Sequence, residues 1–324
     1  MSDDLSLRIA RPDDVPAVLQ LLRDSMGRAK DPRFEELFRW KHFDNAFGPS
    51  PIWVACDGDR IVALRTLMRW EFERGSSTAR CVRAVDTATH PTYQGRGLFR
   101  RLTLDALPQL EAEGVAFVFN TPNDSSRPGY LKMGWSAVGT IRARVRPFSL
   151  VGAVRLARNR VPAAHFSVDV GFGVPAAEVL ADGPAVDGLL ASVAPSEKFR
   201  TRWDRERLRW RYGTGLLGYR AVVAPDGIGG GVALARVRRR GNARELVVAA
   251  LLVPDGDVAA RRALVRRLRH AARADADYAL AAGAVPGFVP VNAGGPELTT
   301  RSLSVTAPTS VDEFDFAMGD IELF

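Results

Sequence analysis

The order of apolar and polar positions in the first half of the chain predicts strands that alternate with helices. Residues 6–14 begin with a short strand, and residues 13–25 carry Leu and Val at helical spacing after an acidic start. Residues 32–44 form a second predicted helix. Its apolar side holds three hydrophobic residues and one lysine, namely Phe34, Leu37, Phe38 and Lys41.

A hairpin comes next, because two β-rich runs within residues 52–72 are joined by Asp57-Gly58-Asp59, a strong turn signal. Four further elements and a returning strand complete the predicted first half. They are a strand over 79–90, a helix over 97–114, a strand over 115–120, a short helix over 123–134 and a strand over 135–145.

The second half repeats this order more faintly. The segments EELFRWKH (35–42) and RERLRWRY (205–212) share a Leu-x-Arg-Trp core, and each precedes a hairpin. A strand (244–253), a helix (257–274) and a strand (277–283) then follow, as in the first half. A spacing near 170 residues indicates duplication of a domain and not a short solenoid repeat.

We therefore predict an α/β protein of two tandem domains, residues 1–148 and 149–324, each with a mixed, mainly antiparallel twisted sheet flanked by helices. The stretch 284–300 is rich in Pro and Gly and is predicted as loop. The acidic, aromatic tail at 311–324 is predicted as a last strand or a docking segment.

Composition narrows the class of protein. The chain has 324 residues, enough for two ordinary domains, and no apolar run approaches a membrane span. The N-terminus carries no basic-then-apolar signal segment, so we expect a cytoplasmic protein. Cys56 and Cys81 fit neither a metal spacing nor a disulfide framework.

The net charge of +8 favours anionic partners such as phosphates or acidic metabolites. The arginines of residues 257–274 take one face of a helix whose other face is apolar, which is typical of a solvated face. Without interleaved aromatic residues or a known motif, this pattern disfavours a nucleic-acid partner.

The stretch THPTYQGRGLFRRL (89–102) carries the clearest chemistry. A glycine-rich turn at a helix N-terminus directs backbone N–H groups at one point, where the helix dipole adds positive charge. Gly95 and Gly97 remove the Cβ atoms that would keep a ligand off the backbone, and Arg96, Arg100 and Arg101 add charge. We therefore predict a pyrophosphate site. A P-loop is excluded because no Gly-Lys-Ser/Thr follows, and the dinucleotide fingerprint lacks its third glycine.

The order of elements and two motifs resemble the GCN5-related N-acetyltransferase family. The family's acyl-CoA turn, Gln/Arg-x-x-Gly-x-Gly/Ala, falls on Thr92 to Gly97, with Thr92 departing at the first position. The later signature of that family falls on Asn123, Tyr130, Gly134 and Trp135. The resemblance is strong over residues 5–148 and faint beyond them.

This resemblance implies an acyl-CoA site with acetyl-CoA as the expected donor and no metal. The strand before the turn is expected to splay from the next strand and pair with the pantetheine arm, while an N–H near Val85 or Asp86 polarises the thioester carbonyl. Amides from Gln94 to Phe99 are expected to hold the pyrophosphate. The predicted donor-binding residues are Val85, Thr87, Ala88, Thr89, Gln94, Gly95, Arg96, Gly97, Leu98, Phe99, Arg100 and Asn123.

The resemblance also assigns catalytic roles. Tyr130 is expected to protonate the leaving thiolate as general acid. The family often uses a glutamate early on the strand before the turn as base, but residues 78–86 contain none. Asp86 is the first candidate for the base, Glu71 and Glu73 on the preceding strand are the next, and deprotonation through water stays open.

The equivalent turn of the second half has one glycine, Gly256, between Asp255 and Asp257, whose charge would repel a pyrophosphate. We therefore expect a degenerate second domain that buttresses the first or shapes the acceptor cleft. The predicted activity is acyl-CoA-dependent N-acylation of a small-molecule amine, with O-acylation left open. The alternative is a non-catalytic acyl-CoA-binding or scaffolding protein.

Overall fold

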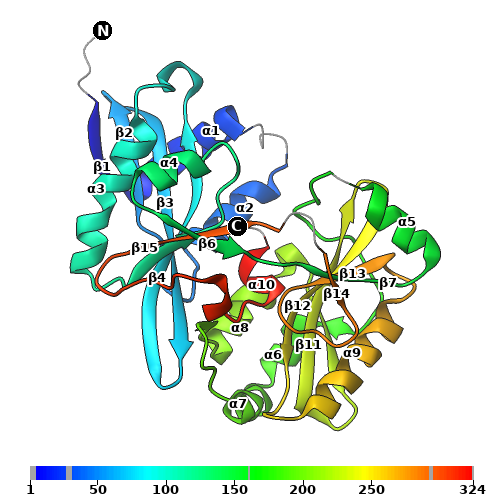
Figure 1. The fold of residues 1–324 in the computed structure, drawn as a ribbon. Coiled ribbons are helices and arrows are strands. Elements are labelled where there is room, and N and C mark those ends of the chain that lie inside the picture. Colours follow the sequence, from blue (N-terminus) through cyan, green and yellow to red (C-terminus); the bar gives the residue numbers. More distant parts are fainter. Residues whose placement is uncertain (1–4, 27–30, 160, 292–294, 323–324) are drawn as a thin grey trace.

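The computed structural model describes residues 5–26, 31–159, 161–291 and 295–322. Two sheets lie in two halves of the molecule, with the first half at the left of Figure 1 and the second at the right. Each sheet is mixed and mainly antiparallel and is flanked by helices, as the sequence predicts.

The first sheet has the order β1-β2-β3-β4-β5-β15-β6, with β9 added beside the end of β3. Only the β4–β5 pair is parallel. Its strands are β1 (Ser6–Ile9), β2 (Ile52–Asp57), β3 (Arg60–Arg74), β4 (Ser77–Thr89), β5 (Phe117–Asn120), β6 (Ser136–Thr140), β9 (Arg200–Thr201) and β15 (Glu297–Ser302).

Two pairs of helices cover the two faces of this sheet. Helices α1 (Val15–Met26) and α2 (Arg33–His42) pack through Leu19 and Phe38 against one face. Helices α3 (Leu98–Ala112) and α4 (Arg127–Lys132) pack through Leu102 and Tyr130 against the other. The predicted helices and the hairpin turn at residues 58–59 are therefore present.

The second sheet has the order β14-β7-β13-β12-β11-β10-β8, with β12–β13 as its parallel pair. Its strands are β7 (Arg144–Pro147), β8 (Val174–Pro175), β10 (Arg220–Ala224), β11 (Gly227–Arg240), β12 (Ala243–Leu252), β13 (Tyr278–Ala281) and β14 (Val289–Pro290). Its helices are α5 (Leu150–Arg158), α6 (Ala176–Ala181), α7 (Gly183–Ser192), α8 (Arg205–Tyr212) and α9 (Val258–Ala272), and α10 (Met318–Ile321) follows near the C-terminus.

The two sheets exchange strands across residue 148. The predicted strand over 135–145 is two strands, of which β6 stays in the first sheet and β7 pairs with β13 in the second. In return, β15 runs between β5 and β6 of the first sheet, in a stretch predicted as loop. The loop prediction is wrong there because its Pro and Gly residues flank the strand and do not interrupt Glu297–Ser302.

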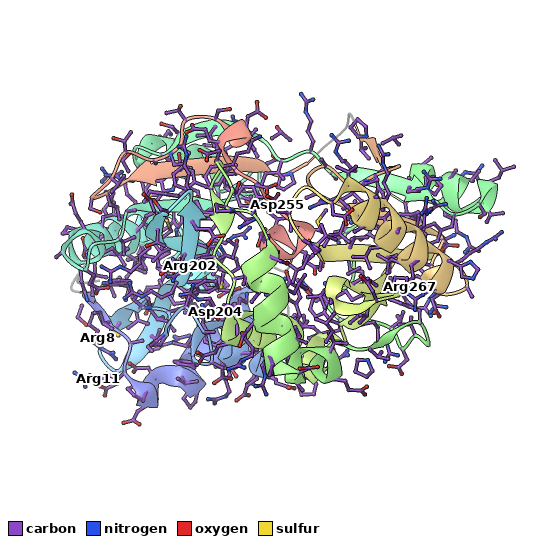
Figure 2. All side chains as sticks on the ribbon, turned by 90° about the horizontal axis from the view of Figure 1, so that it is seen from below. Arg8, Arg11, Arg202, Asp204, Asp255 and Arg267 are labelled. Carbon is purple, nitrogen blue, oxygen red and sulfur yellow. The ribbon has the colours of Figure 1, made fainter. Side chains whose placement is uncertain are left out.

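The interface between the halves is a continuous apolar core. One cluster of buried side chains runs from Leu37 and Trp70 in the first half to Leu208 and Leu234 in the second. The C-terminal tail docks here as the short helix α10, shown in red between the halves in Figure 1. Arg202 and Asp204 also lie between the two halves: Figure 2 shows them between Arg8 of the first half and Arg267 of the second.

Candidate functional site

The central feature of the first sheet is a gap between β4 and β5. The two strands pair only from Cys81 to Arg83, opposite Phe117 to Phe119. Beyond Arg83, β4 runs on to Thr89 with β3 at its other edge, while β5 ends at Asn120. Backbone groups along one edge of β4 therefore have no strand partner among the described residues, and an extended ligand can pair with them as an added strand.

A β-bulge lies at the middle of this gap. Thr66 of β3 lies opposite Val85 and Arg65 opposite Thr87, so Asp86 is the extra residue. Asp86 has a φ of +41°, and it is the only residue of the described ranges, glycine aside, with a positive φ. The Thr66 hydroxyl donates to the carbonyl oxygens of Val85 and Asp86 at 2.5 and 3.2 Å and holds the bulge.

The Asp86 side chain belongs to a buried polar cluster on the α2 side of the sheet. Its carboxylate pairs with the Lys41 ammonium and lies 2.9 Å from Nε2 of His42, whose Nδ1 is 2.9 Å from the Ser50 hydroxyl. Burial lowers the pKa of His42, so the ring is neutral, donating from Nε2 to Asp86 and accepting at Nδ1 from Ser50. The cluster thus links Ser50 to Asp86 by hydrogen bonds.

A pocket of about 300 Å³ opens above this cluster between α1 and α2. Its walls are mainly apolar, with Leu19, Leu22 and Phe38 among them, and Lys41 and Asp86 also line it. The pocket therefore combines an apolar enclosure with one buried ion pair, an arrangement typical of small-molecule sites.

The predicted phosphate turn has the geometry that its glycines suggest. Gly95 and Gly97 have φ values of +77° and +71°, and a Cβ at either position would meet nothing within 4 Å. Gly97 is the N-cap of α3, so no side chain caps the helix, and its first turn contains no acidic residue. The first amides of α3 are thus free to bind an anion. Arg96 packs over the Tyr93 ring at 4.7 Å, and Arg100 is exposed on the first turn.

Tyr130 lies on the α3–α4 face of the same sheet. The side chain is buried, with the rings of Phe99 and Trp135 edge-on at 5.2 and 5.3 Å. The Asn123 side chain accepts a hydrogen bond from the Ser126 backbone at 2.9 Å and fixes the start of α4. The Arg65 guanidinium lies 5.2 Å from the centre of the Tyr130 ring.

The other predicted bases lie elsewhere. Glu71 pairs with Arg202 and Arg207, and Glu73 pairs with Arg200, all at the junction with the second half. Burial alone would raise the pKa of Glu71, but the hydrogen bond from Arg202 and the charge of Arg207 lower it overall. Glu71 is six residues from Arg65 along β3, roughly 20 Å away in an extended strand.

Sequence reasoning did not find the partners of Asp86. Lys41 gave a signal, because it lies on the apolar side of a predicted helix where a lysine needs a counter-charge. His42 and Ser50 gave none, since their contact depends on how α2 meets the strand that follows it. Arg65 was also missed, because a single arginine in a strand pattern reads as a surface residue.

The second half has the corresponding gap without the corresponding turn. Its parallel strands pair only from Glu245 to Val247, and the groove beyond is lined by the C-terminal segment, including Phe316 and Met318. The Asp257 side chain caps α9 by accepting from the Ala260 amide at 2.6 Å. The helix start is therefore capped by a side chain in the second half, whereas the start of α3 is not, and the C-terminal segment forms part of the groove wall.

No group of three or more His, Cys, Asp and Glu side chains in the described ranges is arranged to hold a metal ion. In the same part of the chain, no helix has both the length and the apolar character needed to cross a bilayer.

Comparison with known proteins bears on the fold and the family. A family model described as an acetyltransferase (GNAT) domain matches residues 6–138. No curated protein matches the sequence.

Three solved structures cover most of this chain. A probable N-acyltransferase from Enterococcus faecalis has a TM-score of 0.66 at 10% identity, with 93% of this chain and 73% of that chain covered. A GCN5-related N-acetyltransferase from Kribbella flavida has a TM-score of 0.63 at 17% identity, covering 93% and 71%. Eis1 from Mycobacterium abscessus has a TM-score of 0.56 at 15% identity, covering 92% and 74%.

At such low sequence identities, the solved structures show only that the fold is similar. The family-model match over residues 6–138 includes the splayed strands, the glycine turn and Tyr130. Such a domain supports acyl transfer to nitrogen in general. Residues 6–138 therefore match an acetyltransferase (GNAT) domain, and a second sheet of the same layout follows them.

Proposed function

We propose that the protein transfers an acyl group, most simply acetyl from acetyl-CoA, to a small-molecule amine by direct attack in a ternary complex. One observation carries this proposal. The uncapped glycine turn before α3 follows the unpaired edge of β4 along the chain, and the buried Tyr130 lies beside Arg65, which donates to Thr87 on β4. The reaction is assigned to the cytoplasm, where acyl-CoA esters are made and used.

The donor is bound mainly by backbone. Val85, Thr87, Ala88 and Thr89 offer strand groups to the pantetheine arm, and the turn from Gln94 to Phe99 offers amides to the pyrophosphate. Arg96 and Arg100 add positive charge at the turn, and Asn123 secures the helix that carries Tyr130. The free amides and the absence of a carboxylate in the first turn of α3 support this assignment.

The acceptor enters the pocket between α1 and α2, so its amine reaches the thioester from the face of β4 opposite Tyr130. Asp86 takes the amine proton, directly or through water, while Lys41 and His42 fix the orientation of its carboxylate. The apolar walls of the pocket favour an amine attached to an apolar body of modest size.

The second half acts as a support. Asp257 caps the helix start, and the tail segment with α10 lines the groove where a donor would lie, so we propose that this half binds no acyl-CoA. Its contribution is to hold α2, and with it one wall of the acceptor pocket, through the shared core.

Calorimetry with acetyl-CoA tests the donor site. We expect one site per chain in the wild type and none in Gly97→Glu, which puts a side chain and a negative charge at the turn. Gly256→Glu is the matched control, because Gly256 also has a positive φ, of +64°, and open space at its Cβ. Two sites per chain would overturn the assignment of the second half, and no binding would overturn the acyltransferase proposal.

Tyr130→Phe separates an enzyme from a binding protein. We expect the transfer rate to an amine found by screening to fall about 100-fold or more, because proton donation to the thiolate is lost, with acetyl-CoA affinity nearly unchanged. Tyr93→Phe is the control, since its hydroxyl donates to Asp57 at 2.5 Å outside the gap. Binding of acetyl-CoA without transfer to any amine in the wild type would favour the non-catalytic alternative.

A further inference from the structure

Arg65 is a buried cation without a counter-ion. Its side chain is almost fully inaccessible, at 1% exposure, on the α3–α4 face of β3. One nitrogen, Nη1, donates to the Thr87 hydroxyl at 2.5 Å. Nε and Nη2 have no hydrogen-bond partner, and no carboxylate lies within ion-pairing distance, among the residues that the structure describes.

Two other buried arginines, Arg236 and Arg211, have partners for the same two nitrogens. Arg236 donates from Nε and Nη2 to Glu322 at 3.0 and 2.9 Å, and Arg211 donates to the Gly319 carbonyl through the same two nitrogens. An unpaired buried charge is costly, and a protein keeps one where a binding partner or a reaction supplies the opposite charge. Arg65 therefore marks a place where an anion is expected.

The position of Arg65 identifies that place. Its guanidinium carbon lies 5.2 Å from the centre of the Tyr130 ring and 5.4 Å from that of Phe99. Its fixed nitrogen contacts Thr87, one of the residues along the unpaired edge of β4. The two N–H groups without a partner are covered by protein atoms and lie behind this edge of β4, beside the ring of the proposed general acid.

We propose that Arg65 stabilises the thiolate of coenzyme A as it leaves, an inference that rests on the donor site proposed above. The amine nitrogen forms its bond to the thioester carbon, the carbon–sulfur bond breaks, and the electron pair goes to sulfur. Arg65 donates to that sulfur while its charge is greatest, and Tyr130 then transfers its proton to it. The amine loses one proton to Asp86 or water and Tyr130 regains one from water, so no further reactant is needed.

Arg65 and Tyr130 would act on the same leaving sulfur in two different ways. A guanidinium stays charged at any accessible pH and cannot protonate the sulfur, so it can only stabilise the anion. A tyrosine hydroxyl can supply the proton but carries no charge to stabilise the anion before transfer. Together they lower the barrier to expulsion of the thiolate, which is the step that charge stabilisation accelerates most.

Titration of the thiol of bound coenzyme A tests this inference without turnover. The ultraviolet absorbance of the thiolate is followed against pH for free coenzyme A bound to the protein, with the desulfo-coenzyme A complex as blank. We expect the thiol pKa in the wild-type complex to be at least about one unit below that in Arg65→Met, a tenfold difference in thiolate at a given pH. Arg69→Met is the control, because Arg69 lies on the same strand but pairs with Glu113.

The outcomes are distinguishable. If coenzyme A does not bind the wild type, the proposed function fails. If it binds and the thiol titrates alike in the wild type and Arg65→Met, the inference fails and Arg65 is structural. A merely structural arginine would also lower the melting temperature when replaced, whereas we expect Arg65→Met to melt at the wild-type temperature or above it.

Two further arms complete the test. Should Arg65→Met not fold, Thr87→Val replaces it, because loss of the hydroxyl releases Nη1 and is expected to raise the thiol pKa in the same direction by less. An unchanged thiol pKa in Thr87→Val would then overturn the inference. An acyl carboxylate is the other anion that could pair with Arg65. Tighter binding of succinyl-CoA than acetyl-CoA that is lost in Arg65→Met, with an unchanged thiol titration, would replace the thiolate with that carboxylate.

Discussion

Asp86 and Thr87, two neighbouring residues of β4, have their side chains on opposite faces of the sheet. Asp86 at the bulge contacts Lys41 and His42 on the α2 side, whereas Thr87 contacts Arg65 on the α3–α4 side. Side chains alternate along a strand, so two chemistries can lie one residue apart without interfering. In the proposed reaction, the acceptor and its base therefore approach from one face and the leaving group departs on the other.

Asp86→Asn tests the base. The amide keeps the shape and tolerates the positive φ, but it cannot take a proton, so we expect a rate about 100-fold lower or more, as is typical for loss of a general base. An unchanged rate would assign the deprotonation to water. The double variant Lys41→Met/Asp86→Asn removes the buried ammonium as well, and should recover melting temperature without recovering activity.

At the scale of elements, α2 and α8 meet through a reciprocal contact. The rings of Trp40 and Trp210 stack at 5.0 Å, and each indole N–H donates to the other's backbone carbonyl, at 2.9 and 3.0 Å. The two residues hold the same place in the repeated Leu-x-Arg-Trp core. The repeat seen in the sequence is therefore a pseudo-twofold contact in space, as between the subunits of a symmetric dimer.

A double-mutant cycle measures this contact. Trp40→Phe and Trp210→Phe should each lower the free energy of unfolding by about 1 to 3 kcal/mol, because each leaves a buried carbonyl unsatisfied. We expect a coupling energy of about 1 kcal/mol between them from chemical denaturation. Trp40→Phe combined with Trp135→Phe is the control pair, which should be additive since Trp135 lies on the far face of the first sheet. Additivity of the first pair would contradict the reciprocal contact.

The docking of α10 makes stability depend on pH. Burial raises the pKa of Asp320 to about 6, although the Thr201 hydroxyl and the Ala317 amide donate to its carboxylate at 2.8 and 2.7 Å. The protonated form therefore favours folding. The stabilisation by this group is complete below about pH 4 and is lost as the pH rises through about 6.

Asp320→Asn isolates this effect. From pH 4 to pH 7, the wild type should lose up to about 3 kcal/mol of unfolding free energy relative to the variant, because only the wild type has a carboxyl group that ionises here. The pKa of Glu322 shifts in the opposite direction, because Arg236 and Arg238 lower it against the effect of burial. Glu322 is present in both proteins, so its contribution cancels in this difference. A difference that stays constant with pH would contradict the raised pKa.

At the scale of the whole molecule, the two sheets are not built from two separate lengths of chain. The division predicted at residue 148 does not coincide with the two sheets, since β7 lies in the second sheet and β15 in the first. Thr299 of β15 pairs with Asn120 on one side and Ala137 on the other and is fully buried. The proposed donor site therefore lies in a sheet that is completed by β15.

Thr299→Pro tests this dependence. Proline cannot donate to a strand ladder, and an interior strand tolerates its loss poorly, so we expect the variant to lose cooperative unfolding of the first half. Thr299→Val is the control, because it keeps the strand and loses only the hydroxyl bond to Asn120 at 2.8 Å. Near-normal thermal unfolding of the proline variant would show that β15 is dispensable.

The sequence predicted what is local and missed what depends on long-range pairing. The turn at Gly95 and Gly97, the hairpin turn and the helix around Tyr130 follow from residue type and spacing within a few positions. The exchange of β7 and β15 does not, because a short strand shows which face is apolar but not which sheet it joins. The environments of Arg65 and Lys41 were also not predicted, because the contacts of a charged side chain depend on residues that are distant in sequence.

The late position of β15 also affects how the protein is made. Thr299 follows its partner Asn120 by 179 residues, which a ribosome takes roughly 10 to 40 s to synthesise. During that interval β5 and β6 of the nascent chain have open edges, which attract other strands and chaperones. The first half, although translated first, is therefore completed last, and a polypeptide released before Ser302 would carry the glycine turn and Tyr130 without the complete sheet that positions them.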